Sequence, residues 1–181
     1  MKQQENNEFD YHSLIDIKIT SNTSLNLDTE LWVKKVYEFK DFYPETVLIS
    51  NRNGWQSKSD LHLNEVFFPL VKILNQKIQL YTGSPNSFLR DMWVNISPHG
   101  SYNEIHCHNT SEININYSGV LYLKCPPNSG NIIFYNPLNI YLRTPITPSE
   151  NFLLFFNDRL PHSVEPNLSQ EDRISIAFNF S

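Results

Sequence analysis

Apolar residues recur every three or four positions in two segments near the N-terminus, residues 28–39 and 65–82. This spacing is typical of one face of an amphipathic helix. The apolar positions are Trp32, Val36 and Phe39 in the first segment, and Phe67, Leu70, Val71, Leu74, Ile78 and Tyr81 in the second. Asp28 is a candidate N-cap, and Pro69 falls in a first helical turn, where its missing N–H is tolerated. We therefore predict two helices. The first dozen residues are polar and are predicted to be frayed.

From about residue 87 the pattern changes to short runs rich in β-branched and aromatic residues, separated by Pro, Gly, Asn and Ser. Strands are predicted at residues 88–97, 103–108, 114–124, 130–135, 139–143, 151–157, 162–166 and 172–180. Short strands at this spacing are typical of an all-β sandwich or barrel. The chain is thus expected to form one domain over residues 1–181, with residues 1–85 as a helical cover and residues 86–181 as a β-barrel.

Two of these runs alternate clearly between apolar and polar residues. The last run has Ile174, Ile176, Phe178 and Phe180 on one face, and Arg173, Ser175, Ala177 and Asn179 on the other. The run near residues 92–97 has Met92, Val94 and Ile96 opposite Trp93, Asn95 and Ser97. Because successive side chains of a strand point to opposite faces, the apolar faces are expected to pack on the two helices. The polar faces are then expected to line a cavity.

Composition narrows the functional classes. The net charge of −5 argues against a dedicated nucleic-acid binder, which usually carries a basic patch. The chain has no apolar run of membrane-spanning length, and its start lacks the apolar core of a secretory signal, so no membrane association and a cytoplasmic location are expected. Cys107 and Cys125 are the only cysteines, and nothing in their context indicates a disulfide framework.

Three histidines are candidates for one metal site. His106 and His108 alternate with Cys107 in a predicted strand, so both imidazoles point to the same side. His162, which follows a later apolar strand, can supply a third nitrogen and complete a facial site with open positions. The alternative is an ordinary strand, in which H-x-H pairs are common without a metal. The other histidines are interpreted as surface or loop residues: His12, His62 and His99.

The surroundings of these histidines resemble the 2-oxoglutarate/Fe(II) dioxygenase superfamily, and more closely a phage and bacterial branch of it. That superfamily has H-x-[DE], a distal His, and an Arg with a Ser two residues on. The corresponding segments here are Trp93-Val-Asn95-Ile, Asn103-Glu-Ile-His106-Cys-His108, Ser118-Gly119-Val120-Leu-Tyr122, Leu160-Pro-His162-Ser-Val164-Glu-Pro166 and Arg173-Ile-Ser175-Ile-Ala-Phe178-Asn179. The resemblance covers roughly residues 25–180.

This resemblance implies a mainly β fold, a double-stranded β-helix (jelly roll, cupin-like) with the N-terminal helices packed on one sheet. It implies Fe(II) at His106, His108 and His162, with 2-oxoglutarate and O2 as cosubstrates, decarboxylation to succinate and hydroxylation of a substrate. Residues implied to bind 2-oxoglutarate are Arg173, Ser175 and Tyr122, and further polar contacts are expected from Asn95 and Asn103. The substrate, small molecule or peptide, is left open, as is a homo-oligomer.

One position departs from the superfamily, because His108 stands where the carboxylate of H-x-[DE] is expected. Glu104, on the same strand face, and Glu112 are alternative ligands or partners of a ligand. A three-histidine, cupin-type dioxygenase that uses no 2-oxoglutarate is therefore a rival function. A non-enzymatic jelly-roll protein that binds a sugar or nucleotide is a second rival. Finally, the loop at residues 51–57 is expected either to close over the cavity mouth or to pack Trp55 on the barrel.

Overall fold

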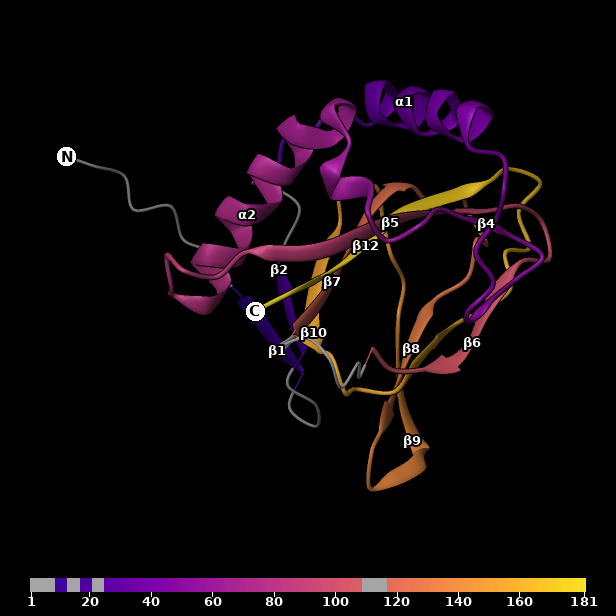
Figure 1. The fold of residues 1–181 in the computed structure, drawn as a ribbon. Helices are drawn as coiled ribbons and strands as arrows, with labels where there is room; N and C mark the ends of the chain where they lie inside the picture. The colour runs from indigo at the N-terminus through magenta and orange to yellow at the C-terminus, as the bar shows by residue number, and fades with distance from the viewer. Residues whose placement is uncertain (1–8, 13–16, 21–24, 109–116) are drawn as a thin grey trace.

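The computed structural model describes residues 9–12, 17–20, 25–108 and 117–181. It is mainly β, with two antiparallel sheets and two α-helices on the outer side of one sheet (Figure 1). The seven-stranded sheet has the order β1-β2-β10-β7-β12-β5-β4, and the five-stranded sheet has the order β3-β6-β11-β8-β9. The elements are β1 (Phe9–His12), β2 (Ile17–Thr20), α1 (Thr29–Phe42), β3 (Asn51–Arg52), β4 (Trp55–Gln56), η2 (Leu61–Leu63), η3 (Glu65–Phe67), α2 (Phe68–Thr82), β5 (Leu89–Ser97), β6 (Tyr102–His106), β7 (Tyr117–Lys124), β8 (Ile132–Asn136), β9 (Asn139–Ile146), β10 (Leu153–Asn157), β11 (His162–Val164) and β12 (Arg173–Phe180).

Both predicted helices are confirmed, with small differences at their ends. The Asp28 carboxylate caps α1 by accepting a hydrogen bond from the Leu31 N–H at 3.0 Å. The segment 65–67, predicted as α-helix, forms the short 3-10 helix η3 instead, and α2 follows it with Pro69 in its first turn. Proline fits there because the first-turn N–H groups have no partner within the helix.

Strands lie in all eight segments predicted for them, as β5 to β12. The predicted start of β7 at residues 114–116 lies outside the described residues. The strand predicted over residues 103–108 ends at His106, so His108 lies just beyond it.

Short strands also form before residue 86, where the sequence predicted a frayed terminus, two helices and a loop. Strands β1 and β2 pair with each other, and β2 extends the seven-stranded sheet beside β10. Part of the N-terminal dozen, Phe9–His12, is therefore a strand rather than a frayed end. The expected loop at residues 51–57 contains β3 and β4, which pair with β6 and β5. These strands are two to four residues long, and pairing with neighbouring strands of the sheets stabilises them more than their own pattern indicates.

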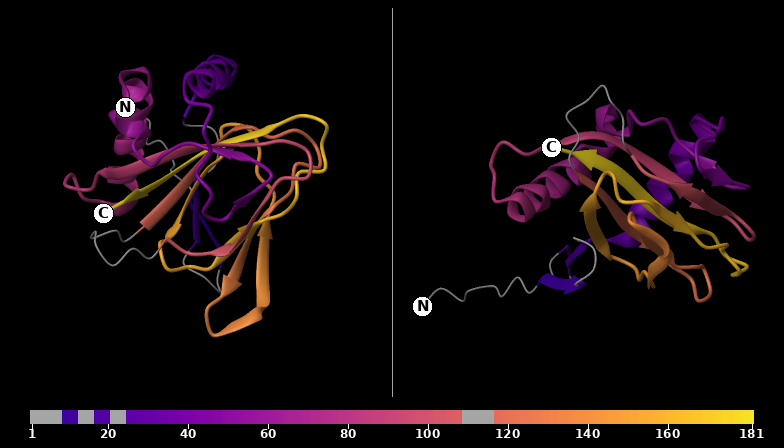
Figure 2. Two further views of the ribbon diagram at one scale, coloured as in Figure 1. Left: turned by 45° about the vertical axis from the view of Figure 1, so that its right-hand side comes forward. Right: turned by 90° about the horizontal axis from the view of Figure 1, so that it is seen from below.

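The apolar faces of β5 and β12 pack against the two helices, as predicted. The views in Figure 2 place both helices on the same side of the seven-stranded sheet. The core between them includes Trp32 and Val36 of α1, Leu70, Leu74 and Ile78 of α2, Met92, Val94 and Ile96 of β5, and Ile174, Ile176 and Phe178 of β12. Helices and sheet thus bury one continuous apolar layer, which leaves the opposite face of β5 and β12 for a cavity between the sheets.

Gly119 of β7 lies where this core is tightest. A Cβ atom at Gly119 would collide with the ring of Phe178 and lie 3.0 Å from Cδ1 of Phe155. Only a residue without a side chain fits between these two rings.

None of the helices in the described parts of the chain is long and apolar enough to cross a membrane.

Candidate metal centre and cavity

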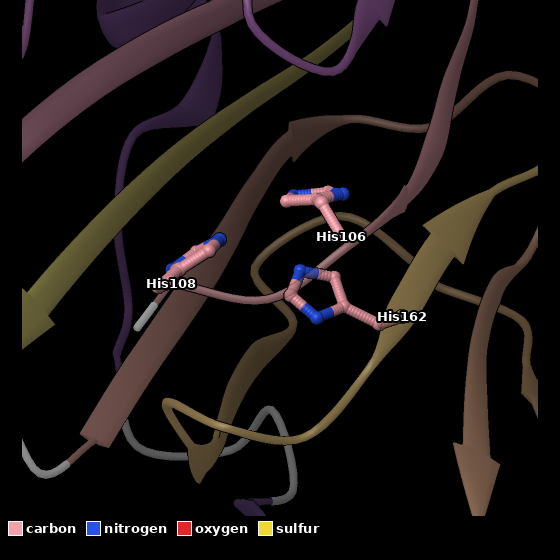
Figure 3. Close-up of side chains that lie close together, drawn as sticks. All are labelled: His106, His108 and His162. Carbon is pink, nitrogen blue, oxygen red and sulfur yellow. The ribbon is translucent and has the colours of Figure 1, made fainter. Parts of the chain in front are cut away.

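His106, His108 and His162 meet between the two sheets (Figure 3). His106 is the last residue of β6 and His162 is the first of β11, and the two are direct partners in the antiparallel register. His108 lies two residues beyond β6, where its backbone N–H donates to the Asp158 carbonyl oxygen at 2.8 Å. The two sheet strands and this anchored extension therefore bring the three imidazoles to one point.

The distances among the three histidines suit a single ion. One side-chain nitrogen from each lies within 4.8 Å of the corresponding atoms of the other two. The ring centroids are 4.3 Å apart for His106 and His162, 5.0 Å for His108 and His162, and 5.3 Å for His106 and His108. Ligand nitrogens that each bind a metal at about 2 Å are separated by about 3 Å, so a small contraction of this cluster completes the site.

Hydrogen bonds fix which nitrogen of each ring is available. Nδ1 of His106 donates to the carbonyl oxygen of Glu104 at 2.8 Å, and Nδ1 of His162 donates to that of Leu160 at 2.9 Å. A carbonyl oxygen only accepts, so the ring proton resides on Nδ1 and the Nε2 lone pair is left for a metal. Metal-binding histidines in proteins use this arrangement to set tautomer and ring orientation.

His108 is held by side chains instead. Its Nδ1 donates to Oδ1 of Asn179 at 2.8 Å and lies 2.8 Å from Oγ of Ser118, whose hydroxyl donates to the same Oδ1. Nδ2 of Asn179 donates to Oδ1 of Asp91 at 2.8 Å, which fixes the orientation of the amide. The sequence pattern placed Asn179 on the cavity face, but its contact with His108 was not predicted. These contacts follow from the strand register, in which Asn179 lies opposite both Asp91 and Ser118.

All three imidazoles are neutral in this environment. Burial lowers the pKa of His106, lowers that of His108 to about 4, and lowers that of His162 well below its usual value. Mutual repulsion of the ring charges lowers the pKa of His108 and His162 further. Since only the neutral ring can bind a metal, the site is ready for one at neutral pH.

The carboxylate alternatives to His108 find no support. Glu104 is exposed and forms an ion pair with Arg52, so its side chain lies at the surface, away from the three histidines. Glu112 lies outside the described residues. Among the described residues, the cluster with metal-binding geometry consists of histidines alone.

A cavity of about 270 Å³ extends from the histidines between the sheets. Every predicted site residue lines it: His106, His108, His162, Arg173, Ser175, Tyr122, Asn95 and Asn103. Arg173 is only 3% exposed, and its Nη1 donates to the carbonyl oxygen of Ser129. No ion pair found among the described residues involves Arg173, and burial lowers the pKa of its guanidinium. Burial of a cation without a counter-charge among the described residues costs free energy, which an anionic ligand would offset.

The polar residues around Arg173 form a row across four strands. In the sheet register Gln56 lies opposite Asn95, Asn95 opposite Ser175, and Ser175 opposite Tyr122. Oδ1 of Asn95 is buried and has no hydrogen-bond partner. The row therefore offers unused polar groups to a ligand.

Asn103 and Ser50 lie on the opposite sheet, beside His106. Nδ2 of Asn103 donates to Oγ of Ser50 at 3.1 Å, and this Oγ lies 3.4 Å from Nε2 of His106. Asn103 thus contacts Ser50, and Ser50 in turn lies beside the ring of His106. Ser50 was missed as a site residue, although it stands directly before the segment singled out at residues 51–57.

Within residues 51–57, some side chains are buried in the core and others line the cavity. Trp55 is 7% exposed and packs in the core near Phe39, with ring centroids 6.4 Å apart, so it does not close over the mouth. Gln56 and Ser57 line the cavity. The alternative of Trp55 packing on the barrel is therefore confirmed.

No protein-family model matches the chain, and no curated protein matches it in sequence. Solved structures do match in fold. A prolyl-4-hydroxylase of Pseudomonas putida has a TM-score of 0.68 at 16% identity, covering 92% of each chain. A 2OG-Fe(II) oxygenase family oxidoreductase of Burkholderia pseudomallei has a TM-score of 0.70 at 14% identity, covering 91% of this chain and 84% of that one. HygX of Streptomyces hygroscopicus, with nickel, 2-oxoglutarate and hygromycin B bound, has a TM-score of 0.68 at 12% identity, covering 93% and 83%. The chain shares the fold of these 2-oxoglutarate/Fe(II) oxygenases.

Proposed function

We propose that the protein is a 2-oxoglutarate- and Fe(II)-dependent oxygenase that hydroxylates a small-molecule or peptide substrate. The observation that carries the proposal is one cavity with three convergent neutral histidines and a buried, unpaired arginine. A metal site alone fits many functions. The arginine adds a place for a dicarboxylate, which is the cosubstrate that this fold uses in its solved relatives.

The proposed architecture is the double-stranded β-helix, or jelly roll. Its support is the strand order, in which β5-β12-β7-β10 form one four-stranded layer and β6-β11-β8-β9 form the other. From β5 to β12, consecutive strands alternate between the two layers except at the β8-β9 hairpin, whose two strands lie in the same layer, as expected when a long hairpin is wound into a barrel. This winding brings β6, β11 and β12 to one cavity although they lie far apart in the sequence.

The three histidines fit iron(II). Imidazole nitrogens suit this metal, and three ligands on one face leave open positions for 2-oxoglutarate and O2. When bound, the iron supplies the oxygen chemistry, and the protein supplies binding and orientation. His106 and His162 are oriented by backbone carbonyls, and His108 by Asn179.

Arg173 is the proposed partner of the distal carboxylate of 2-oxoglutarate. Its guanidinium can hold a carboxylate through two parallel hydrogen bonds, and burial strengthens such charge-assisted bonds. Tyr122 and Ser175 line the same end of the cavity and can donate hydroxyl hydrogen bonds. Burial raises the pKa of Tyr122 far above neutral, so its hydroxyl keeps its proton for donation.

The three-histidine set also fits one rival function, a dioxygenase that uses no 2-oxoglutarate. Without a carboxylate ligand the iron site is one unit more positive than in the H-x-[DE] enzymes, which favours a dioxygenase that binds an anionic substrate directly. That rival leaves Arg173 without a function, since a buried guanidinium costs free energy unless something pairs with it. Succinate production discriminates, because only the 2-oxoglutarate enzyme releases it.

The direct test is an anaerobic titration of the purified protein with iron(II) and then 2-oxoglutarate, followed by visible absorption and by succinate release after oxygen is admitted. We expect an absorption change that saturates at one 2-oxoglutarate per iron, and succinate on oxygenation. Iron binding without a response to 2-oxoglutarate would promote the three-histidine rival. Failure to bind iron would favour a binding protein.

A further inference from the structure

Two residues that line the cavity carry a full charge within the described chain: Arg173 and Asp91. They lie on neighbouring strands, but at opposite ends. Arg173 starts β12, whereas Asp91 on β5 is paired with Asn179 near the end of β12. Six residues of extended strand separate Arg173 from Asn179, which corresponds to about 20 Å. The cavity is therefore positive at one end and negative at the other.

The metal site lies at the Asp91 end. His108 is hydrogen-bonded to Asn179, and Asn179 is hydrogen-bonded to Asp91. Trp93, two residues along β5 on the same face, packs edge-on against His108 with ring centroids 5.3 Å apart. With 2-oxoglutarate extending from Arg173 to the metal, the region beside Asp91 and Trp93 is left for the substrate.

The carboxylate of Asp91 has no ion-pair partner among the described residues. Its Oδ1 accepts one hydrogen bond from Asn179. Burial raises its pKa, and the hydrogen bond from Asn179 and the nearby charge of His62 offset this only in part. A cation placed beside the carboxylate would relieve the cost of that burial.

We propose that Asp91 is a specificity-determining residue that pairs with a protonated amine of the substrate beside the Trp93 ring. This inference rests on the proposed function for what happens to the bound amine. An indole face attracts a cation, so Trp93 and Asp91, neighbours on the same face of β5, favour the same charge. The substrate class is thus an amine whose reacting C–H bond lies a few atoms from the ammonium group.

The Asp91→Asn variant separates substrate binding by Asp91 from a role limited to positioning Asn179. The asparagine keeps an oxygen that accepts from Nδ2 of Asn179, but it removes the charge. We expect the manganese affinity of this variant to stay within about threefold of the parent. Asp60→Asn is the matched control, because Asp60 is exposed, adjoins β5 through a bridge to Met92, and does not line the cavity.

The probes are n-pentylamine, n-pentanol and pentanoate, which match in chain length and differ in charge. The measurement is the enhancement of their proton relaxation rates by the manganese-loaded, 2-oxoglutarate-saturated protein. In the parent and in Asp60→Asn, the amine should show at least about a fivefold larger enhancement than the alcohol, the size of a partly exposed ion pair. In Asp91→Asn the two should agree within about twofold.

Equal enhancement of amine and alcohol by the parent overturns the inference, and this result needs no variant to fold. A preference that persists in Asp91→Asn overturns it as well. Calorimetric titration of the manganese-loaded protein with 2-oxoglutarate, before any has been added, tests the proposed function separately. Binding of 2-oxoglutarate without an amine preference removes only the amine site, whereas an amine preference without 2-oxoglutarate binding removes the oxygenase.

Discussion

At the scale of single residues, the site depends on how each histidine is held. His106 and His162 are fixed by backbone carbonyls, which substitution does not remove, whereas His108 depends on the Asn179 side chain. His106, His108 and His162 could be predicted from the sequence because H-x-H alternation and a distal histidine are visible in one dimension. Asn179, Asp91 and Ser50 could not, because their contacts follow from strand register and not from spacing.

Metal affinity should depend on the three histidines and on the side chain that orients His108. Replacing His106, His108 or His162 by Ala should weaken iron(II) binding at least tenfold, and Asn179→Ala should weaken it about tenfold through the loss of orientation. His99→Ala, at an exposed histidine outside the cavity, serves as the control. Anaerobic equilibrium titration measures each. If His108→Ala binds iron as the parent does, His108 is not a ligand and the three-histidine site is wrong.

The lowered pKa values of the histidines predict a pH dependence of stability in the metal-free protein. His108 titrates near pH 4 in the folded state and near 6.5 when unfolded, so the unfolded chain binds more protons between these values. Stability should therefore fall as the pH drops from 6.5 towards 4. Because one pKa unit corresponds to about 1.4 kcal/mol, this residue should contribute a loss of about 2 kcal/mol by pH 4.5.

Urea unfolding of the metal-free parent and of His108→Gln at pH 7 and 4.5 isolates this contribution. The variant should lose less stability than the parent, by about 2 kcal/mol. The exposed His99→Gln control should behave as the parent does. An unchanged pH dependence in His108→Gln would show that the ring is not held neutral by burial.

At the scale of elements, alternation was the reliable signal. The strand β12 alternates over its eight residues and β5 over residues 92–97, so both their positions and their two faces could be predicted. The strands β1 to β4 have two to four residues each, too few for a period to appear. Strands β2, β3 and β4 pair with partners far away in the sequence, and β1 pairs with β2. Each sheet accordingly includes strands from both sides of residue 86.

Gly119 provides a test of packing at this scale. Gly119→Ala places a methyl group against Phe178 and Phe155, and overpacking of this kind costs about 1–3 kcal/mol. Gly83→Ala is the contrasting variant, because its Cβ meets no atom within 4 Å and any cost arises from its φ of +69°. Urea unfolding measures both. Equal stability of Gly119→Ala and the parent would contradict the packing of β7 on β12.

Removal of the N-terminal elements tests the cover. Deleting residues 1–45 takes away β1, β2 and α1, and so exposes the apolar face that includes Ile174, Ile176 and Phe178. Exposed apolar patches of this kind cause association, so the truncated protein should aggregate. Size-exclusion chromatography and a thermal melt decide: a soluble truncation with a cooperative melt would refute this role of α1.

At the scale of the whole molecule, the fold separates two tasks. One face of the seven-stranded sheet buries the apolar layer with the helices, and the other face carries Arg173, Ser175 and Asn179 into the cavity. The five-stranded sheet adds His106 and His162 from the opposite side. A cavity enclosed by two sheets thus holds groups that no single element could bring together.

The central claim is that this cavity binds 2-oxoglutarate through Arg173. The measurement is calorimetric titration of the manganese-loaded protein with 2-oxoglutarate, which avoids turnover. Loss of one partner of a buried charge pair costs about 2–5 kcal/mol, so Arg173→Ala should weaken binding about 30-fold or more. Arg173→Lys should restore only part of the affinity, because lysine lacks the planar fork. Arg143→Ala, at an exposed arginine of β9, should bind as the parent does, and manganese affinity should be unchanged in all three. No binding to the parent, or equal affinity in the parent and Arg173→Ala, would contradict the account.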